Sequence, residues 1–258
     1  MHLEYGPLNE EYVLQFVKQA EAMGLDRIQI LDHTHRFKEF ESCYEELKAY
    51  EVQKTWLENK EMKFKDTLDD FAALMERIKE MDLPVKVSYG LEVCYTPSSE
   101  EKLRQILNDR KFDFLVGAIH SIDGILYDMK FSKELLWDRY SADHIYERYY
   151  ELLKCCIRSS LFTQLAHPDT IKLFQIYPDY DLTKTYEEVA KLLNEYHMKA
   201  ECNTGCHYRY GHPDIGLSDE FLKILKDSEV EIITASDAHH PEDVGKFIRE
   251  AEERIERE

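Results

Sequence analysis

Histidines and acidic residues recur at the ends of apolar, strand-like segments of this 258-residue chain. The segment IITAS (232–236) runs directly into Asp237 and His239, and RIQIL (27–31) runs into Asp32 and His33. Three further apolar segments carry or end in Glu92, His120, and His167 with Asp169. Imidazole and carboxylate groups together are a ligand set for Zn²⁺, Mn²⁺ or Fe²⁺. If the fold brings these ends together, the sequence predicts a cluster of more than one metal ion.

Each of these residues also has an ordinary explanation when taken alone. A single histidine after a strand is more often a satisfied loop or core residue, and Asp237 suits the N-cap of the helix expected after it. The joint occurrence at five strand ends favours ligation, but both readings stay open for each residue. His35 lies in a polar loop, where we expect a solvated side chain.

Apolar runs alternate with helical periodicity along most of the chain, which is typical of βα units around a mainly parallel sheet. Parallel strands in a βα barrel converge at their carboxyl ends, so the residues above would become neighbours. A first helix is expected from Asn9 to Gly24. The predicted strands span 27–31, 85–93, 112–119, 162–166, 198–203 and 230–235. Further helices are expected near 40–60, 66–80, 98–109, 142–158, 183–196, 218–226 and 241–257, with irregular stretches at 121–141 and 203–217.

Composition limits the possible partners. The net charge of −19 repels nucleic acid and anionic lipid surfaces, so we expect neither as a general partner. No apolar run reaches the ~20 residues that span a bilayer, and the first residues do not resemble a signal peptide. We therefore expect a single cytoplasmic domain covering residues 1–258 and acting on a small molecule.

Six motifs occur in the order and approximate spacing of one known family. They are LDHTH (31–35), GLEV (90–93), GAIHSIDG (117–124), AHPDTIK (166–172), ECNTG (201–205) and SDAHHPEDVG (236–245). Together they resemble the histidinol-phosphatase branch of the PHP (polymerase and histidinol phosphatase) superfamily. The resemblance implies an α/β fold, a distorted (β/α)₇ TIM-like barrel, with up to three metal ions at the carboxyl ends of its strands.

The same resemblance implies roles for individual residues. Glu92 resembles a carboxylate that bridges the first two ions, and Asp237 resembles a ligand of the first. The remaining ligands that it implies are His2 for the first ion, His120 and His167 for the second, and His33 and His239 for the third. Asp32 and Asp237 are the expected catalytic acids, Asp32 by orienting His33 or accepting a proton. Arg36, Lys172 and Arg209 are candidate phosphate contacts, although each is equally compatible with a solvated surface role.

The chain departs from the family pattern at its start. The family's first motif is His-x-His at the end of strand one, and His2 matches only its second histidine. Leu8 occupies the position of a later family histidine. We expect either a natural start upstream, with the first strand truncated here, or an altered first site. Glu4 is a candidate substitute ligand, with a solvated acid as the alternative.

These observations predict a metal-dependent phosphomonoesterase with two or three divalent ions (Zn, Mn or Fe). The expected substrate is L-histidinol phosphate, hydrolysed to L-histidinol and phosphate in histidine biosynthesis. Closely spaced ions would activate water and offset the phosphate charge, so no side-chain nucleophile is required. Two alternatives remain: a phosphoesterase of the same superfamily that acts on nucleotides or short nucleic acids, and a non-catalytic metal-binding regulatory domain.

Overall fold

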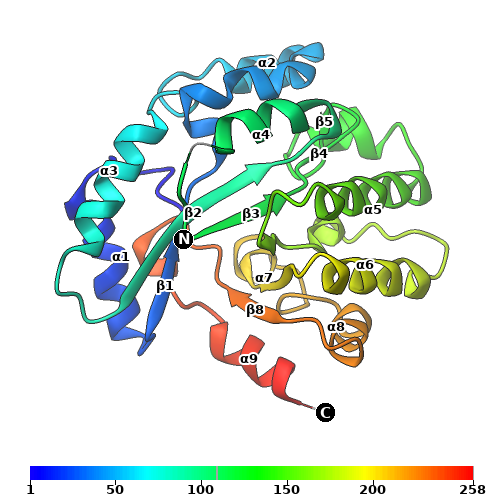
Figure 1. Ribbon diagram of the computed structural model, residues 1–258. Coiled ribbons are helices and arrows are strands. Elements are labelled where there is room, and N and C mark those ends of the chain that lie inside the picture. The colour runs from blue at the N-terminus through cyan, green and yellow to red at the C-terminus, as the bar shows by residue number, and fades with distance from the viewer. Residues whose placement is uncertain (109, 258) are drawn as a thin grey trace.

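The computed structural model describes residues 1–108 and 110–257 as alternating strands and helices (Figure 1). The strands are β1 (Arg27–Ile30), β2 (Lys86–Cys94), β3 (Phe114–Ala118), β4 (Ser121–Ile122), β5 (Ile125–Leu126), β6 (Gln164–Leu165), β7 (Lys199–Asn203) and β8 (Ile232–Ala235). The helices are α1 (Glu10–Ala22), α2 (Glu51–Leu57), α3 (Leu68–Lys79), α4 (Glu100–Asn108), α5 (Ala142–Arg158), α6 (Thr183–Glu195), α7 (Gly205–Tyr210), α8 (Asp219–Asp227) and α9 (Ile248–Glu256).

The central sheet is parallel, with strand order β1-β2-β3-β6-β7-β8. It curls, and helices surround it, as Figure 1 shows. The expected TIM-like βα architecture is thus confirmed. Strand β6 is shorter than the predicted 162–166, because only Gln164 and Leu165 pair with both neighbouring strands.

The first two residues connect the two edge strands of the sheet. The Leu31 amide donates to the Met1 carbonyl (2.9 Å), and the His2 amide donates to the carbonyl of Ala238, just beyond β8 (2.7 Å). His2 also pairs in parallel with Leu31. Residues 1–2 therefore occupy the place of a seventh strand, and the N-terminus lies near the centre of Figure 1.

Local sequence explains the first helix. The Asn9 side chain accepts a hydrogen bond from the Tyr12 amide at 2.9 Å, which is the N-cap interaction predicted there. Its buried residues Val13, Phe16, Val17 and Ala20 recur at helical spacing and face the sheet. The left-handed Gly24 (φ 73°) follows the end of the helix, as expected for a C-terminal stop.

Several stretches differ in detail from the prediction; among them, the helix expected at 241–257 begins only at Ile248, as α9, and α7 lies within the irregular stretch 203–217. The predicted helix 40–60 is a 3₁₀-helical stretch, Lys38–Ala49, followed by α2. The irregular stretch 121–141 contains the β4–β5 hairpin, which the buried Gln53 side chain holds through Gly124 and Leu126. The predicted helix 98–109 corresponds to α4, and its last residue, 109, lies outside the described residues.

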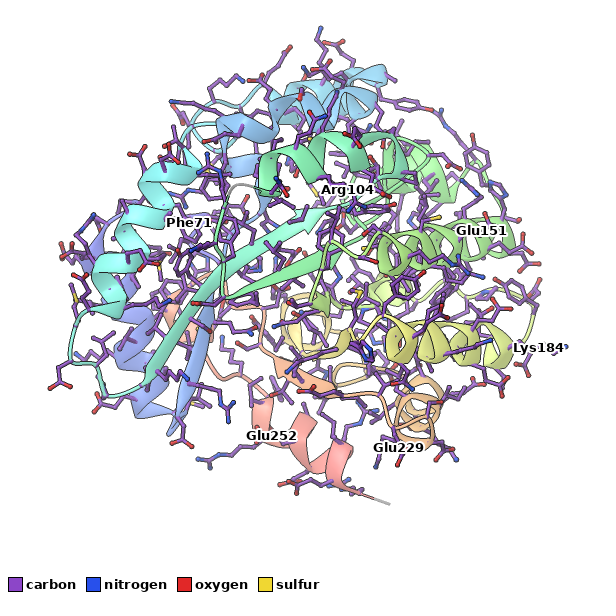
Figure 2. The ribbon with its side chains drawn as sticks, in the orientation of Figure 1. Phe71, Arg104, Glu151, Lys184, Glu229 and Glu252 are labelled. Atoms are coloured by element: carbon purple, nitrogen blue, oxygen red, sulfur yellow. The ribbon has the colours of Figure 1, made fainter. Side chains whose placement is uncertain are left out.

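Charged residues cover the outside of the helical layer. Figure 2 shows Glu151, Lys184 and Glu252 on α5, α6 and α9, and all three side chains are exposed. Phe71 of α3, by contrast, is fully buried. Within residues 1–108 and 110–257, no helix is both long and apolar enough to cross a lipid bilayer.

Candidate metal centre

Glu92 lies at the centre of a cluster of imidazoles at the carboxyl end of the sheet. Its side chain comes from β2 and is only 4% exposed. Oε1 lies 2.8 Å from His120 Nε2, 3.3 Å from His33 Nδ1 and 3.4 Å from His167 Nε2. Oε2 lies 3.3 Å from His2 Nε2. One carboxylate thus contacts four histidines from different segments, as a bridging ligand would.

Asp237 approaches the same cluster from the end of β8. Its Oδ1 lies 2.9 Å from His2 Nε2, and its Oδ2 accepts a hydrogen bond from Arg209 at 2.9 Å. Asp237 (φ 53°) and His167 (φ 27°) both have left-handed backbones. Such conformations are unfavourable for non-glycine residues and concentrate at functional sites, where the surrounding fold fixes them.

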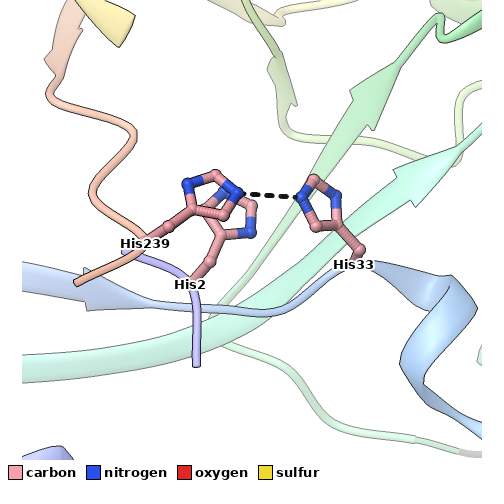
Figure 3. Close-up of side chains that lie close together, drawn as sticks. All are labelled: His2, His33 and His239. Atoms are coloured by element: carbon pink, nitrogen blue, oxygen red, sulfur yellow. Dashed lines mark hydrogen bonds between the residues drawn. The ribbon is translucent and has the colours of Figure 1, made fainter. Parts of the chain in front are cut away.

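The imidazoles of His2, His33 and His239 form a second group beside Glu92 (Figure 3). His33 Nε2 and His239 Nε2 are 3.3 Å apart. The His2 ring stacks on both, with centroids 4.2 Å from His33 and 4.3 Å from His239. Glu4 Oε2 lies 3.8 Å from His239 Nε2 on the cavity side. Four nitrogen and oxygen donors therefore face one small region.

The carboxylates and imidazoles of the cluster shift one another's pKa values. Burial opposes charge on Glu92, but His33, His120, His167 and His2 hold its pKa well below the usual range. Burial likewise disfavours a charged His2, yet hydrogen bonds to Asp237 and Glu92 raise its pKa to about 9. The carboxylates are thus anionic in the metal-free protein, and His2, with its pKa raised to about 9, holds a proton at neutral pH. A divalent cation in place of those protons would satisfy the same oxygens and ring nitrogens.

A carboxylate from the β4–β5 region supports His120. Asp128 Oδ2 lies 2.9 Å from His120 Nδ1, while His120 Nε2 faces Glu92. A ring nitrogen held by a carboxylate fixes the orientation of a metal-ligating histidine and raises its basicity. Burial lowers the His120 pKa, but Asp128 and Glu92 more than offset it and raise the pKa well above its ordinary value.

The cluster forms the floor of a cavity of about 270 Å³. Acidic and aromatic side chains line its walls, among them Glu4, Asp128, Tyr44, Trp56 and Tyr210. Small-molecule sites in proteins are mostly ~300–1,000 Å³, so this cavity suits a compact ligand.

Of the predicted phosphate contacts, only Arg209 lines this cavity. Its side chain lies on α7, is one-quarter exposed, and also reaches His239 Nδ1 at 3.1 Å. The guanidinium therefore stands beside the side chains of Asp237 and His239 in the cavity wall.

The structure does not fit a phosphate-binding role for Arg36. Its guanidinium is buried, binds Asp32 at 2.8 Å and Asp66 at 2.6 Å, and donates to the carbonyls of Leu3 and Gly6. Asp32 is fully buried in this network, where its other oxygen accepts from the His33 amide. The prediction that Asp32 handles a proton of the leaving group does not fit this position, and its contact with His33 is with the backbone amide, so the expected orientation of the His33 ring stays a prediction.

Lys172 is also unsuited to phosphate contact. Its ammonium is buried and binds Asp169 and Asp214, each at 2.8 Å, and the Gly216 carbonyl at 2.9 Å. Three acceptors from two segments, Asp169 and the loop that contains Asp214 and Gly216, already satisfy all three of its N–H donors. Lys172 therefore links loops behind the cluster.

Sequence reasoning missed part of the cavity wall. His35, expected in solvent, is buried and lies 3.6 Å from Glu4 Oε1. Lys63 and Trp56 also line the wall, from a segment in which no motif pointed to a site. The available signal was the position of His35 directly after β1 and two residues from His33, in the short 3₁₀ helix Thr34–Arg36.

Comparison with known proteins agrees with this geometry. A sequence profile of the PHP domain matches residues 2–205, which is most of the chain. The chain belongs to the PHP domain family. A probable histidinol-phosphatase of Clostridium acetobutylicum is 26% identical over 126 residues, 46% of this PHP chain and 48% of the relative. One of Deinococcus radiodurans is 25% identical over 163 residues, 62% and 60% of the two chains. The alignments thus span about half to three-fifths of the relatives' lengths.

Two solved structures share the fold of this PHP chain. Histidinol phosphate phosphatase from Lactococcus lactis subsp. lactis, in complex with zinc, L-histidinol and phosphate, aligns with a TM-score of 0.68 and 16% identity, covering 94% of this chain and 85% of that one. A putative histidinol phosphatase from Listeria monocytogenes aligns with a TM-score of 0.65 and 15% identity, covering 95% and 94%. These similarities establish a common barrel.

The donor set in this PHP chain fits divalent metal ions. Its donor atoms come from buried and partly buried imidazoles and carboxylates that form four overlapping groups, each with donors within 4.8 Å of one another. Such a set suits zinc, manganese or iron. The buried Nδ1 atoms of His2 and His167 make no hydrogen bond within the described residues, while the Nε2 atom of each ring faces Glu92.

Proposed function

We propose that this protein is a metal-dependent phosphomonoesterase whose substrate is L-histidinol phosphate. The observation that carries the proposal is the convergence of four imidazoles on Glu92 at the floor of a small-molecule cavity. Divalent ions bound there would supply Lewis-acid charge to phosphoryl oxygens and lower the pKa of attacking water. The ligands that we assign are His2, His33, Glu92, His120, His167, Asp237 and His239.

The protein's own side chains would bind and orient the substrate. Arg209 is positioned to donate hydrogen bonds to a phosphoryl oxygen at the cavity floor. The acidic and aromatic walls suit a leaving group that carries an ammonium and an aromatic ring, as L-histidinol does. The same walls offer no basic groove for a nucleic acid backbone, and the net charge of −19 opposes one.

The relatives support this choice of substrate. Both curated relatives carry the name probable histidinol-phosphatase, and the Lactococcus structure holds zinc, L-histidinol and phosphate. Two or three ions per chain, of zinc, manganese or iron, would fill the donor groups that the structure presents.

A substrate panel tests the proposal. Phosphate release from L-histidinol phosphate, adenosine monophosphate and a short oligonucleotide is measured with Zn²⁺ or Mn²⁺ present. We expect kcat/KM for histidinol phosphate to exceed that for the nucleotide by about 100-fold or more. A preference for the nucleotide would support the nucleotide phosphoesterase instead. Metal binding without phosphate release from any substrate would support the regulatory domain.

A further inference from the structure

Glu4 and Lys63 form a buried ion pair in the cavity wall. Lys63 Nζ lies 2.8 Å from Glu4 Oε1, and the two side chains are 5% and 7% exposed. Lys63 Nζ also lies 3.1 Å from His35 Nε2 and 4.2 Å from the centre of the Trp56 ring. Glu4, His35 and Trp56 therefore contact the ammonium from three sides, and the ion pair uses the Oε1 atom of Glu4.

The other carboxylate oxygen of Glu4 faces two histidines. Oε2 lies 4.0 Å from His33 Nε2 and 3.8 Å from His239 Nε2, and these nitrogens are 3.3 Å apart. Donor atoms bound at ~2.0–2.2 Å to one ion are ~3–3.5 Å apart, so a small side-chain movement would complete the set. No hydrogen bond to Oε2 occurs among residues 1–108 and 110–257.

We propose that Glu4 Oε2 is the third protein ligand of a divalent ion held by His33 Nε2 and His239 Nε2. The inference rests on the proposed function, because it assumes that the cluster binds metal. Lys63 fixes Oε1, so Glu4 binds the ion through one oxygen. Leu8 takes no part, since its side chain packs against the hydrophobic core.

The proposal specifies the chemistry of this position. Two imidazoles and one carboxylate are a harder ligand set than three imidazoles, and carboxylate oxygens suit Mn²⁺ and Fe²⁺. We therefore expect this ion position to accept Mn²⁺ readily. Neutralising Glu4 should mainly weaken this one ion position, because its Oε2 faces His33 Nε2 and His239 Nε2, whereas Glu92 Oε1 faces His33 Nδ1.

Mn²⁺ binding to purified wild-type and variant proteins tests the proposal. Bound equivalents and affinities are measured by equilibrium dialysis with elemental analysis, after removal of metal. We expect Glu4→Gln to lose one equivalent or to bind its weakest ion about 10-fold to 100-fold less tightly. The matched control is Asp66→Asn, a carboxylate that also pairs with a buried cation, Arg36, but lies outside the cavity. The control should keep the wild-type equivalents.

A double variant separates ligation from folding. Glu4→Gln alone leaves the Lys63 ammonium buried without its partner, whereas Glu4→Gln with Lys63→Met removes both charges. The double variant should fold and show the same loss of one Mn²⁺ ion. Unchanged Mn²⁺ equivalents and affinities in both Glu4 variants would overturn the inference, while phosphate release by the wild type would leave the proposed function standing.

Discussion

At the scale of single residues, substitution of Glu92 tests whether the cluster binds metal or is an ordinary buried hydrogen-bond network. Glu92→Gln preserves the shape of the side chain but removes the charge that faces four histidines. We expect kcat to fall about 100-fold to 1,000-fold, with reduced metal content. Arg209→Met should cost only about 10-fold to 100-fold, because a charge-assisted hydrogen bond contributes ~1.5–3 kcal/mol. Kinetics and elemental analysis compare the two, and normal metal content in Glu92→Gln would exclude a bridging role.

Arg36 yields a prediction about stability. Arg36→Met leaves Asp32, which is fully buried, without its cation. Breaking a buried pair from one side costs about 3–5 kcal/mol, so the free energy of unfolding should fall by roughly that amount. Urea denaturation of the variant checks this, with Arg77→Met, which breaks an exposed pair with Glu10, as the control. A loss below about 1 kcal/mol would show that the Arg36 network contributes little.

The candidate metal ligands were predictable from the sequence, but the ion pairs that engage the side chains of Arg36 and Lys172 were not. His33, Glu92, His120, His167 and Asp237 each follow or occupy a strand, and parallel strands bring such positions together. Arg36 and Lys172 also follow site motifs. Only the folded structure reveals how fully carboxylates neutralise both, because the partly exposed Asp66 and Asp214, which lie 30 and 42 residues away, add to the contacts of each cation.

At the scale of elements, helix α7 positions Asp237. A Cβ atom added at Gly205 would lie 2.8 Å from Asp237 Oδ2, so a side chain there would displace the carboxylate. We expect Gly205→Ala to lower both kcat and metal affinity about tenfold or more. The control is Gly211→Ala at the other end of α7, where φ is 73° and no atom lies within 4 Å of the added Cβ. That variant should lose about 1–2 kcal/mol of stability but keep its metals.

The elements themselves were largely predictable from periodicity. The strand positions were correct because apolar runs bounded by polar turns mark buried strands. The division of 40–60 into a 3₁₀ stretch and α2 was not visible, because both share helical spacing of apolar residues. The short strand formed by Met1 and His2 agrees with the truncated first strand expected from the family motif, although two residues carry no periodic signal of their own.

At the scale of the whole molecule, the charge balance links metal binding to pH. Hydrogen bonds to Asp237 and Glu92 raise the pKa of His2 from 6.5 to about 9 in the metal-free protein. Stabilisation from protonated His2 is fully present below about pH 6.5 and is lost as pH rises through about 9. The Tm of the metal-free protein should therefore fall over that interval, whereas the Tm of the zinc-loaded protein should not.

The same protonation predicts proton release on metal binding. His2 must lose its proton to ligate, so affinity should rise about tenfold per pH unit between pH 7 and 9 for each proton displaced. Calorimetry in two buffers with different ionisation enthalpies measures the protons released. Binding with no proton release at pH 7 would show that His2 is not a ligand.

The most direct test of the account is whether phosphatase activity depends on ions held by the Glu92 cluster. Wild-type protein is stripped with a chelator, then titrated with Zn²⁺ or Mn²⁺ while bound metal and phosphate release from L-histidinol phosphate are measured together. We predict that activity disappears with the metal and returns as two or three equivalents bind per chain. Phosphate release that persists in fully metal-free protein would contradict the account.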